Sequence, residues 1–257
     1  MTAFEDYSQK YQHVRMRRED GVLEMTLHSE GGSLQWNLVA QGELAQAFTE
    51  VGADRANRII IITGTGDDFI GPRINPKISV YKEGGAAITP LGLDRVHWNA
   101  KRLMTRLLDI EVPMIGVING PAKRHAELGL MCDIVIASET ATFEDTAHFS
   151  LGGQVPGDGI NIVYSMLMGL NRARYLMLTG QILSAKEAKE IGLVSELWPK
   201  EKLQARAWEL ARQLARKNDL LLRYTRVVLT EPLRELIDAR VQYHLGLETL
   251  AKLEDPS

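Results

Sequence analysis

The sequence has a single cysteine and no long apolar run. Cys132 is the one cysteine among 257 residues, so no internal disulfide can form, and its place in an apolar segment favours a buried, inert thiol. A lone cysteine also fits a reducing compartment. No stretch reaches the roughly 18 uncharged apolar residues of a membrane span, and the N-terminus lacks the apolar segment of a secretory signal. We therefore expect a cytoplasmic protein without a membrane partner.

An excess of charge of one sign is also lacking. The 30 basic and 33 acidic side chains give a net charge of −3, so nothing indicates a nucleic acid or an anionic membrane as a partner. A composition that is 45% hydrophobic and 25% charged is typical of a globular protein.

Several cofactor and catalytic motifs are missing. The glycines of 152–159 do not form a dinucleotide fingerprint, because no β-rich run leads directly into a G-x-G-x-x-G pattern. No P-loop, G-x-S-x-G or H-E-x-x-H motif occurs. Glu144 and Asp145 lie near a histidine, but no second histidine or cysteine stands at metal-ligand spacing. We therefore expect no cofactor and no metal.

What the sequence does contain is an alternation of strand-like and helix-like segments. Asp20-Gly21 between two extended segments is a hairpin signal. Strand patterns lie at 14–18, 22–28, 58–63, 112–118 and 193–197, and helical patterns at 37–51, 94–108, 160–168, 172–178 and 184–192. Strands alternating with helices predict an α/β fold of βαβ units with a mainly parallel sheet. Residues 67–93 are irregular and predict a loop near a pocket.

The last quarter of the chain is helical throughout. Leu203, Ala207, Leu210, Ala211 and Leu214 recur on one helix face, and Pro232 is expected to open a last helix. We therefore divide the chain into a core at 1–200 and a helical region at 201–257, which packs back on the core or on a neighbouring subunit.

Candidate catalytic residues concentrate between residues 111 and 158. His125 follows a buried strand in a polar turn, where loops present catalytic groups, although an ordinary surface histidine is an equally simple interpretation. His148 and Asp158 suit a general base and its orienting acid. The alternative is a structural histidine and an aspartate that caps the helix starting near residue 160.

Two further residues are ambiguous by type alone. Trp36 has an indole N–H that suits polarising a carbonyl, but a tryptophan is more often part of the core. Glu248 would ordinarily be a solvated charge on a helix.

The order of several motifs resembles the crotonase (enoyl-CoA hydratase/isomerase) superfamily over nearly the whole chain. The motifs are RIIIITGTGDDF (58–69), EVPMIGVINGPA (111–122), MCDIVIASETATF (131–143), VPGDG (155–159) and LTGQILSAKEAKEIGLVSEL (178–197). The resemblance implies a spiral of ββα units with a helical C-terminal trimerisation region. It thus implies a homotrimer or a dimer of trimers.

The chain departs from the family where thioester-handling members hold the substrate oxyanion. Those members carry a Gly-Gly-Gly segment whose backbone N–H groups help to form the oxyanion hole, but here the segment reads Lys123-Arg124-His125-Ala126. The other half of the oxyanion hole is typically formed by an Ala-Gly-x-Asp segment. Here that segment reads Ile70-Gly71-Pro72-Arg73, in which the proline has no N–H.

With these departures, the sequence is similar to one branch of the superfamily, the β-diketone hydrolases that include oxocamphor hydrolase. That branch uses a tryptophan, two histidines, an aspartate and a C-terminal glutamate, and the matching residues are Trp36, His125, His148, Asp158 and Glu248. The resemblance implies hydrolysis of the C–C bond between two carbonyls of a small diketone to give a keto acid. It implies that His148 and Asp158 activate water, that His125 and Trp36 hold the oxyanion, and that Glu248 orients His125.

Two alternatives remain at this point. A CoA-thioester hydratase, isomerase or hydrolase on the same fold should bind CoA measurably, whereas the diketone interpretation predicts negligible affinity. The second alternative is a non-catalytic crotonase-like scaffold or RNA-binding relative. The sequence lacks the basic patch that an RNA-binding relative needs.

Overall fold

The structure, a computed structural model, describes residues 3–71 and 89–254. Most of the irregular segment predicted at 67–93 lies outside the described residues. Of the described helices, none combines the length and the apolar character needed to cross a membrane.

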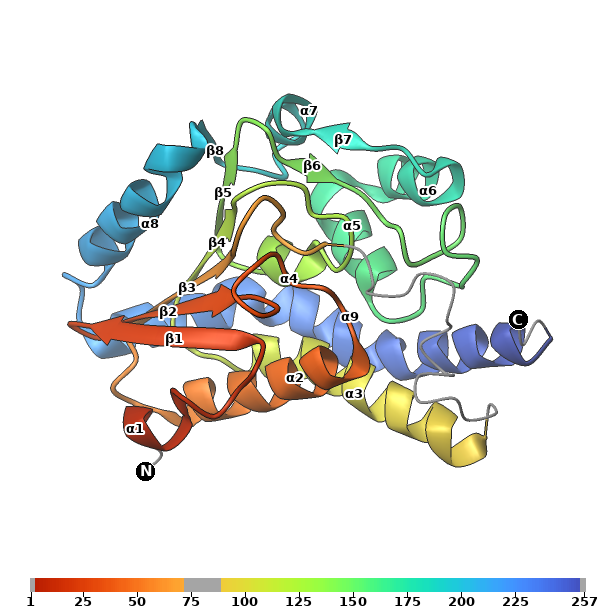
Figure 1. The fold of residues 1–257 in the computed structure, drawn as a ribbon, viewed down its shortest axis with the longest axis horizontal. Coiled ribbons are helices and arrows are strands. Elements are labelled where there is room, and N and C mark those ends of the chain that lie inside the picture. Colours follow the sequence, from red (N-terminus) through yellow and green to blue (C-terminus); the bar gives the residue numbers. More distant parts are fainter. Residues whose placement is uncertain (1–2, 72–88, 255–257) are drawn as a thin grey trace.

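A six-stranded sheet forms the centre of the molecule (Figure 1). Its spatial order is β1-β2-β3-β4-β5-β8, with β1 and β2 antiparallel and every later pair parallel. The strands are β1 (Val14–Glu19), β2 (Val22–Leu27), β3 (Ile59–Gly64), β4 (Met114–Ile118), β5 (Ile134–Ser138) and β8 (Glu196–Trp198). The predicted hairpin is confirmed, with positive φ angles of 49° at Asp20 and 78° at Gly21. The strand predicted at 193–197 is wrong by three residues at its start.

Both faces of the sheet are covered, which explains the unbroken run of isoleucines in β3. Ile60 and Ile62 belong to the main core, together with residues of α2 (Leu38–Ala53) and α3 (Pro90–Leu108). Ile59 and Ile61 pack instead among residues of α8 (Lys200–Leu214). A strand buried on both faces has no solvent side and so needs no polar alternation. The predicted α/β fold with a mainly parallel sheet is confirmed.

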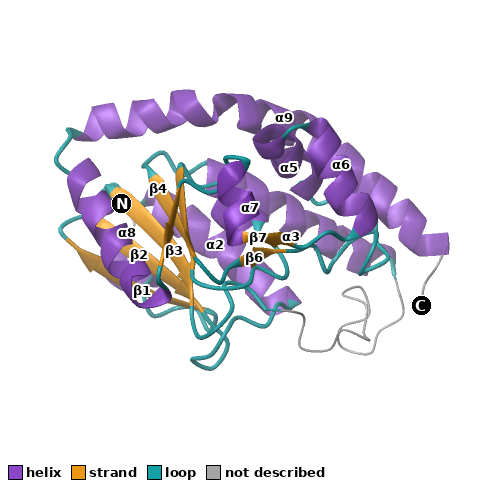
Figure 2. Ribbon diagram, turned by 90° about the horizontal axis from the view of Figure 1, so that it is seen from above, coloured by secondary structure: helices purple, strands orange, loops and turns teal. Residues whose placement is uncertain are grey.

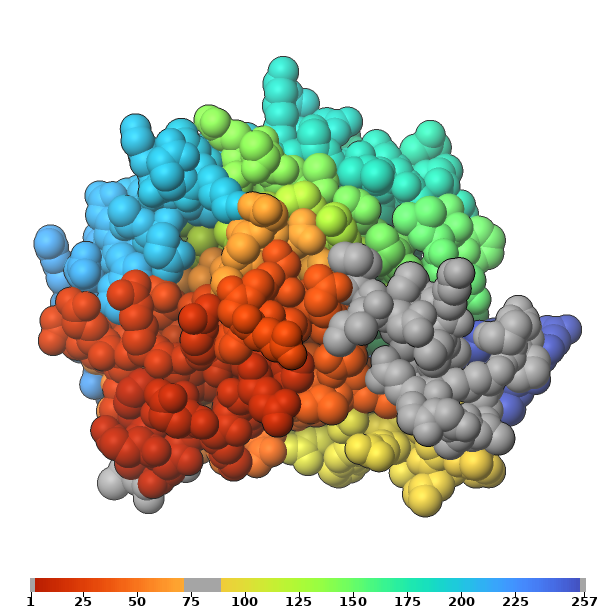
Figure 3. All heavy atoms as spheres, in the orientation of Figure 1, coloured from red at the N-terminus to blue at the C-terminus, as the bar shows by residue number. Residues whose placement is uncertain are grey.

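Helix α8 also contacts the N-terminal hairpin. The Trp208 indole N–H donates to Glu24 Oε2 at 2.5 Å, and the Arg17 guanidinium, 2.9 Å from the same oxygen, lies over the Trp208 ring. Figure 3 shows the hairpin and α8 as adjoining surfaces at one end of the molecule.

Beyond the main sheet, successive turns of the chain stack through single backbone bridges. Parallel bridges pair Gln35 with Gly71, Ile70 with Ala122, and Ala122 with Phe143. The last of these residues belongs to β6 (Thr142–Phe143), which pairs with β7 (Leu183–Ser184). The stack brings the segments after residues 35, 122 and 143 to one side of the core, although they are far apart in the sequence.

The remaining short helices follow their sequence signals. Gly180, with φ 69°, ends α6 (Leu170–Thr179), and Ser184 and Glu187 form a capping box at the start of α7 (Ala185–Glu190), within the helix predicted at 184–192. The helices are α1 (Phe4–Tyr7), α4 (Glu127–Leu130), α5 (Ile160–Met168), α6 (Leu170–Thr179) and α7 (Ala185–Glu190).

One prediction about the C-terminal region is wrong. Pro232 does not open a helix but lies inside α9 (Asp219–Glu254), which runs along one side of the molecule (Figure 2). A proline inside a helix removes one backbone hydrogen bond at a cost of about 3 kcal/mol or more. Tertiary contacts offset this cost: Arg234 pairs with Asp109 at 2.8 Å, and Ile237 and Val241 are fully buried against the core.

We expect Gly120→Ala to destabilise the protein, because the added Cβ would lie 1.8 Å from the backbone carbonyl oxygen of Asp67. Overpacking of this kind typically costs about 1–3 kcal/mol. Gly246→Ala in α9 is the control, since nothing lies within 4 Å of its added Cβ, and there alanine should stabilise by up to about 1 kcal/mol. Urea unfolding followed by circular dichroism measures both. Equal losses in the two variants would contradict the role of the close backbone contact.

Candidate active site

The turn after β4 places His125 at the edge of the core. Asn119 fixes this turn: its side-chain oxygen accepts from the Gly64 N–H at 3.1 Å, and its amide donates to the carbonyls of Gly66 and Asp68. His125 itself has a left-handed backbone, with φ 51°. Non-glycine residues rarely adopt this conformation, and it is often retained at functional sites.

Trp36 and Glu127 hold the His125 ring from two directions. The Trp36 ring stacks on the imidazole, with a centroid distance of 3.8 Å and an interplanar angle of 36°. The Nδ1 atom of His125 lies 2.6 Å from Glu127 Oε1, at the start of α4. All three side chains are buried. His125 is therefore an ordered residue of the protein interior and not the surface histidine that its neighbours Lys123 and Arg124 suggested.

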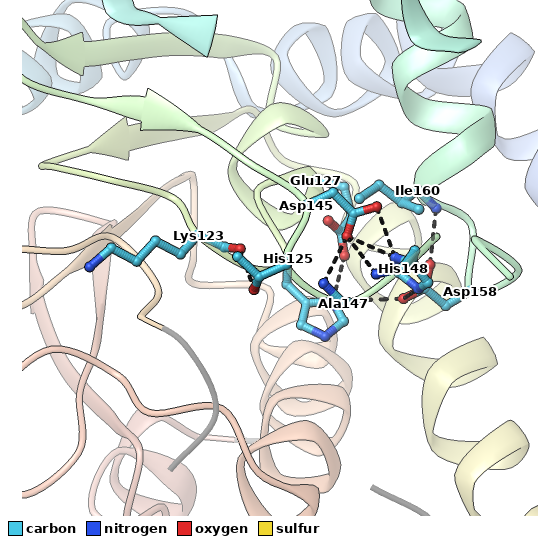
Figure 4. Close-up of polar contacts among 9 residues, drawn as sticks. Lys123, His125, Glu127, Asp145, Ala147, His148, Asp158 and Ile160 are labelled. Atoms are coloured by element: carbon cyan, nitrogen blue, oxygen red, sulfur yellow. Dashed lines mark hydrogen bonds and ion pairs between the residues drawn. The ribbon is translucent and has the colours of Figure 1, made fainter. Parts of the chain in front are cut away.

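His148 lies between two carboxylates, as Figure 4 shows. Its Nδ1 atom is 2.9 Å from Asp145 Oδ1, and its Nε2 atom is 3.5 Å from Asp158 Oδ2. The predicted pairing with Asp158 is present, but it uses only one ring nitrogen, and Asp145 holds the other. Asp158 Oδ1 also accepts a hydrogen bond at 3.2 Å from the N–H of Ile160, the first residue of α5, while the N-cap of this helix is Gly159.

A single oxygen of Asp158 faces both histidines. Besides its contact with His148, Oδ2 lies 3.9 Å from His125 Nδ1. Acidic and imidazole groups thus alternate through the site, in the order Glu127, His125, Asp158, His148 and Asp145 (Figure 4). A proton on either histidine lies beside at least one carboxylate.

The neighbouring charges shift the pKa values of His148 and Asp158. Burial alone would lower the pKa of His148, but the charge of Asp158 and the hydrogen bonds to Asp145 and Asp158 outweigh it and hold this pKa well above 6.5. Burial alone would raise the pKa of Asp158, but the charge of His148 and its hydrogen bond hold it well below 3.8. The pair therefore rests as imidazolium and carboxylate.

Tyr164, on α5, is buried beside these carboxylates. Burial, followed by the charges of Glu127, Asp145 and Asp158, raises its pKa well above 10.0. The side chain is therefore a neutral phenol near the acidic groups.

The arrangement suits hydrogen bonding better than a metal ion. Ligand atoms of His125, Glu127 and Asp158 all lie within 4.8 Å of one another, as in a metal site. Two ligands of one tetrahedral zinc ion are, however, about 3.4 Å apart, whereas Nδ1 and Oε1 are only 2.6 Å apart. That spacing is typical of a charge-assisted hydrogen bond.

Glu248 reaches the neighbourhood of the site from α9. Its side chain packs closely against Gly157, the residue before Asp158. A Cβ added at Gly157 would lie 2.9 Å from both the Cβ and the Oε2 atom of Glu248. It also borders a cavity of about 200 Å³ with Phe149, Gln154 and Val155. The carboxylate hydrogen-bonded to His125 Nδ1 is Glu127, and the predicted action of Glu248 on His125 stays a prediction.

Sequence reasoning missed Asp145, Glu127 and Tyr164. Asp145 stands three residues before a histidine, and this spacing suits a local hydrogen bond as well as a metal site. Glu127 is a charged residue at the start of an apolar segment and two residues from His125, a signal that could have been used. Tyr164 lies in an apolar helix pattern and gave no signal.

Comparison with known proteins defines the family. The profile of the enoyl-CoA hydratase/isomerase family matches residues 17–245, so the chain belongs to this family, the crotonase superfamily expected from the sequence. The 1,2-epoxyphenylacetyl-CoA isomerase of Escherichia coli K12 is 32% identical over 199 residues, covering 77% of this chain and 74% of that protein. The 2,3-dehydroadipyl-CoA hydratase of the same organism is 27% identical over 240 residues, covering 93% and 90%.

Within this family, the chain is similar to a solved β-diketone hydrolase. That enzyme, from the cyanobacterium Anabaena sp. PCC 7120 and bound to (S)-3-oxocyclohexyl acetic acid, is 37% identical, with a TM-score of 0.91 and 98% of both chains covered. An enoyl-CoA hydratase/isomerase from Mycobacterium paratuberculosis is 23% identical, with a TM-score of 0.84 and coverage of 95% and 94%, which shows the shared fold.

The His148–Asp158 pair should make folding stability depend on pH. The folded pKa of Asp158 lies below 3.8, so its contribution is present above pH 3.8 and is lost as the pH falls through the folded value. The folded pKa of His148 lies above 6.5, so its contribution is full below pH 6.5 and is lost as the pH rises through the folded value. Asp158→Asn should therefore lower the Tm most between these two pH values.

Differential scanning fluorimetry across pH measures this effect. Asp67→Asn, which removes the partner of Lys200 in an exposed ion pair, is the control and should change the Tm little. A Tm difference for Asp158→Asn that is the same at all pH values would show that the charges of the pair are not linked to folding.

Proposed function

We propose that this protein is a β-diketone hydrolase that adds water to one carbonyl of a 1,3-diketone and cleaves the bond from that carbonyl carbon to the α-carbon that separates the two carbonyls. The observation that carries the proposal is the juxtaposition of two different histidines. Both histidines face Asp158 Oδ2, while His148 also pairs with Asp145 and His125 stacks on Trp36. The similarity to the Anabaena β-diketone hydrolase supports this assignment.

His148 is the proposed base. In the neutral form of the ring, Asp145 accepts from Nδ1–H, which leaves Nε2 to take a proton from water, and Asp158 Oδ2 is 3.5 Å from Nε2, so one water can contact both atoms. The two carboxylates stabilise the imidazolium that forms. Because they also hold the pKa of His148 above 6.5, the neutral form that acts as base is populated at higher pH.

Trp36 and His125 are the proposed oxyanion donors. When the water oxygen bonds to the carbonyl carbon, the carbonyl π electrons move to oxygen and form an oxyanion. The indole N–H of Trp36 and the His125 ring are side-chain donors, and they replace the backbone donors of the thioester-handling members. Losing one such donor typically lowers kcat by about 10²–10³-fold.

Collapse of the tetrahedral adduct completes the reaction. The oxyanion electrons re-form the C=O bond, the C–C bond breaks, and its electron pair moves to the α-carbon as an enolate stabilised by the second carbonyl. The proton that His148 took from water returns to this carbon across the Asp158 side of the site. Diketone and water thus give one keto acid, or an acid and a ketone, and the scheme uses no cofactor because the second carbonyl stabilises the carbanion.

Glu248 and the C-terminal helix complete the proposal. Glu248 closes the site beside the loop of Asp158 and acts on the charge or orientation of the histidines. We also propose a homotrimer or a dimer of trimers. This is supported by an open, apolar cavity of about 540 Å³ on α9, lined by Leu220, Leu221, Tyr224, Thr225, Val228 and Leu229.

CoA-thioester chemistry is the competing function, since the curated relatives above are named for CoA substrates. The contacts of the turn at Gly71 do not favour it. The Gly71 N–H donates to the Leu34 carbonyl at 2.9 Å and is thus already engaged. At the other half of the expected oxyanion hole, the buried side chain of His125 stands in place of a glycine.

The decisive test is mass-spectrometric detection of products from a panel of bicyclic and monocyclic β-diketones, with crotonyl-CoA alongside. We expect a diketone to gain one water and yield a keto acid. Asp158→Asn and His148→Ala should each reduce turnover by orders of magnitude, because each removes part of the proposed water-activating pair. Turnover of crotonyl-CoA without diketone cleavage would overturn the proposal. Unchanged activity in either variant would remove that residue from the mechanism.

The role of Asp145 has its own test in the pH dependence of kcat/KM. In the parent enzyme the rate should rise with pH through a value above 6.5, as His148 loses its proton. Asp145→Asn removes one of the charges that raise this pKa, so the rise should move to lower pH. The plateau should fall by about 10²–10⁴-fold, because the ring loses its orienting acceptor.

Glu144→Gln is the matched control, because the neighbouring Glu144 carboxylate accepts from Thr142 Oγ1 at 3.1 Å. It should leave the profile in place. An Asp145→Asn profile that overlays the parent would show that Asp145 does not act on His148.

A further inference from the structure

The hydrogen bond between Glu127 and His125 joins two buried side chains. Glu127 is 1% exposed and His125 is 7% exposed. The distance of 2.6 Å from Nδ1 to Oε1 is in the range of charge-assisted hydrogen bonds. The second oxygen, Oε2, is also buried and has no hydrogen-bond partner among the described residues. The side-chain hydrogen bond of this carboxylate is thus the one to His125.

This hydrogen bond decides where the His125 ring carries its protons. An ionised carboxylate only accepts hydrogen bonds, so Nδ1 must be the donor. A neutral imidazole has one N–H, and with that hydrogen on Nδ1 the other nitrogen, Nε2, is an acceptor. His125 can therefore donate to a substrate oxygen from Nε2 only when the ring is an imidazolium with a hydrogen on both nitrogens.

The surroundings keep the ring in this orientation. Trp36 covers one face of the imidazole at a centroid distance of 3.8 Å, while Asp158 Oδ2 lies 3.9 Å from the same Nδ1 atom. Both carboxylates therefore approach the Nδ1 edge. Turning the ring over would move Nδ1 away from two negative charges and place the acceptor-only carboxylate of Glu127 against a C–H group.

We infer that Glu127 is a positioning residue of the proposed hydrolase, and that it holds His125 as an imidazolium whose Nε2–H serves the substrate oxyanion. The inference rests on the proposed function for the identity of the oxyanion. The ring of His125, whose backbone has φ 51°, meets the carboxylate of Glu127 only two residues later in the chain. Glu127 has no contact with the reacting atoms in this scheme and acts through His125.

The first experiment needs no substrate. Nitrogen-15 NMR of histidine-labelled protein at neutral pH reports which ring nitrogens carry hydrogen, and the His125 signals are identified by their loss in His125→Asn. We expect two protonated nitrogens for His125 in the parent protein and only one in Glu127→Gln, with the His148 signals unchanged. A parent His125 ring with hydrogen on Nε2 alone would overturn the inference even if Glu127→Gln did not fold.

A matched control separates this effect from the general cost of breaking a buried pair. Glu43, on α2, forms a comparable contact with His13, the residue before β1, at 2.9 Å from Oε2 to Nδ1. Glu43→Gln should leave the His125 signals as in the parent. Equal changes at His125 in both variants would show that Glu127 has no specific role.

The second experiment measures hydrolysis of a bicyclic β-diketone. Glu127→Gln should lower kcat by about 10²-fold, within the range for a lost oxyanion donor, and should change KM much less. Glu127→Asp, which keeps the charge, should recover part of the loss, and Glu43→Gln should keep the parent kcat. Parent-like kcat in Glu127→Gln would overturn the inference. If the parent cleaves no diketone, the proposed function fails, while the NMR result still decides whether Glu127 sets the protons of His125.

Discussion

The stacking of successive backbone turns is the constraint on which this site depends. Single-residue bridges link the segments at Gln35, Ile70–Gly71, Ala122 and Phe143, which span more than a hundred residues of the chain, and three of these four segments are followed by a candidate site residue. Trp36 follows the first segment, His125 the third, and Asp145 and His148 the last. Backbone hydrogen bonds are directional, so they fix these side chains relative to one another more sharply than apolar packing alone would. The positions of these side chains are therefore well defined, because their segments are joined by backbone bridges.

Alternation of sign is what allows so many ionisable groups to be buried together. Isolated carboxylates or imidazolium ions would be costly in the protein interior, but each histidine here lies next to two carboxylates. The neighbouring Tyr164 remains neutral, because burial and then the nearby carboxylates raise the pKa of its phenol well above 10.0. A row of this kind can move a proton between its members with little change in the total charge that the core must hold, which suits a reaction that takes a proton from water and returns it to carbon.

The sequence was sufficient for the parts of the fold that local chemistry determines. The Asp20-Gly21 hairpin, the isoleucine strand β3 and the capping box at Ser184 all follow from short-range rules, and the structure agrees. Pro232 shows where such rules fail, because tertiary contacts along α9 outweigh the local cost of the proline. Residue type suggested the pairing of His148 with Asp158, and the family resemblance favoured it over a structural histidine and a helix cap. Asp145 and Glu127, in contrast, contact the histidines over only three and two residues. Those contacts depend on which way each side chain points, and residue type and spacing do not determine that direction.

The left-handed backbone at His125 bears on which residues this turn can hold. Thioester-handling members resemble this chain but carry glycines in this segment, and glycine adopts positive φ at no steric cost. A histidine with φ 51° keeps a backbone shape suited to glycine and adds an imidazole to it. The same turn can therefore present either a bare main chain or an imidazole, depending on which residue occupies this position.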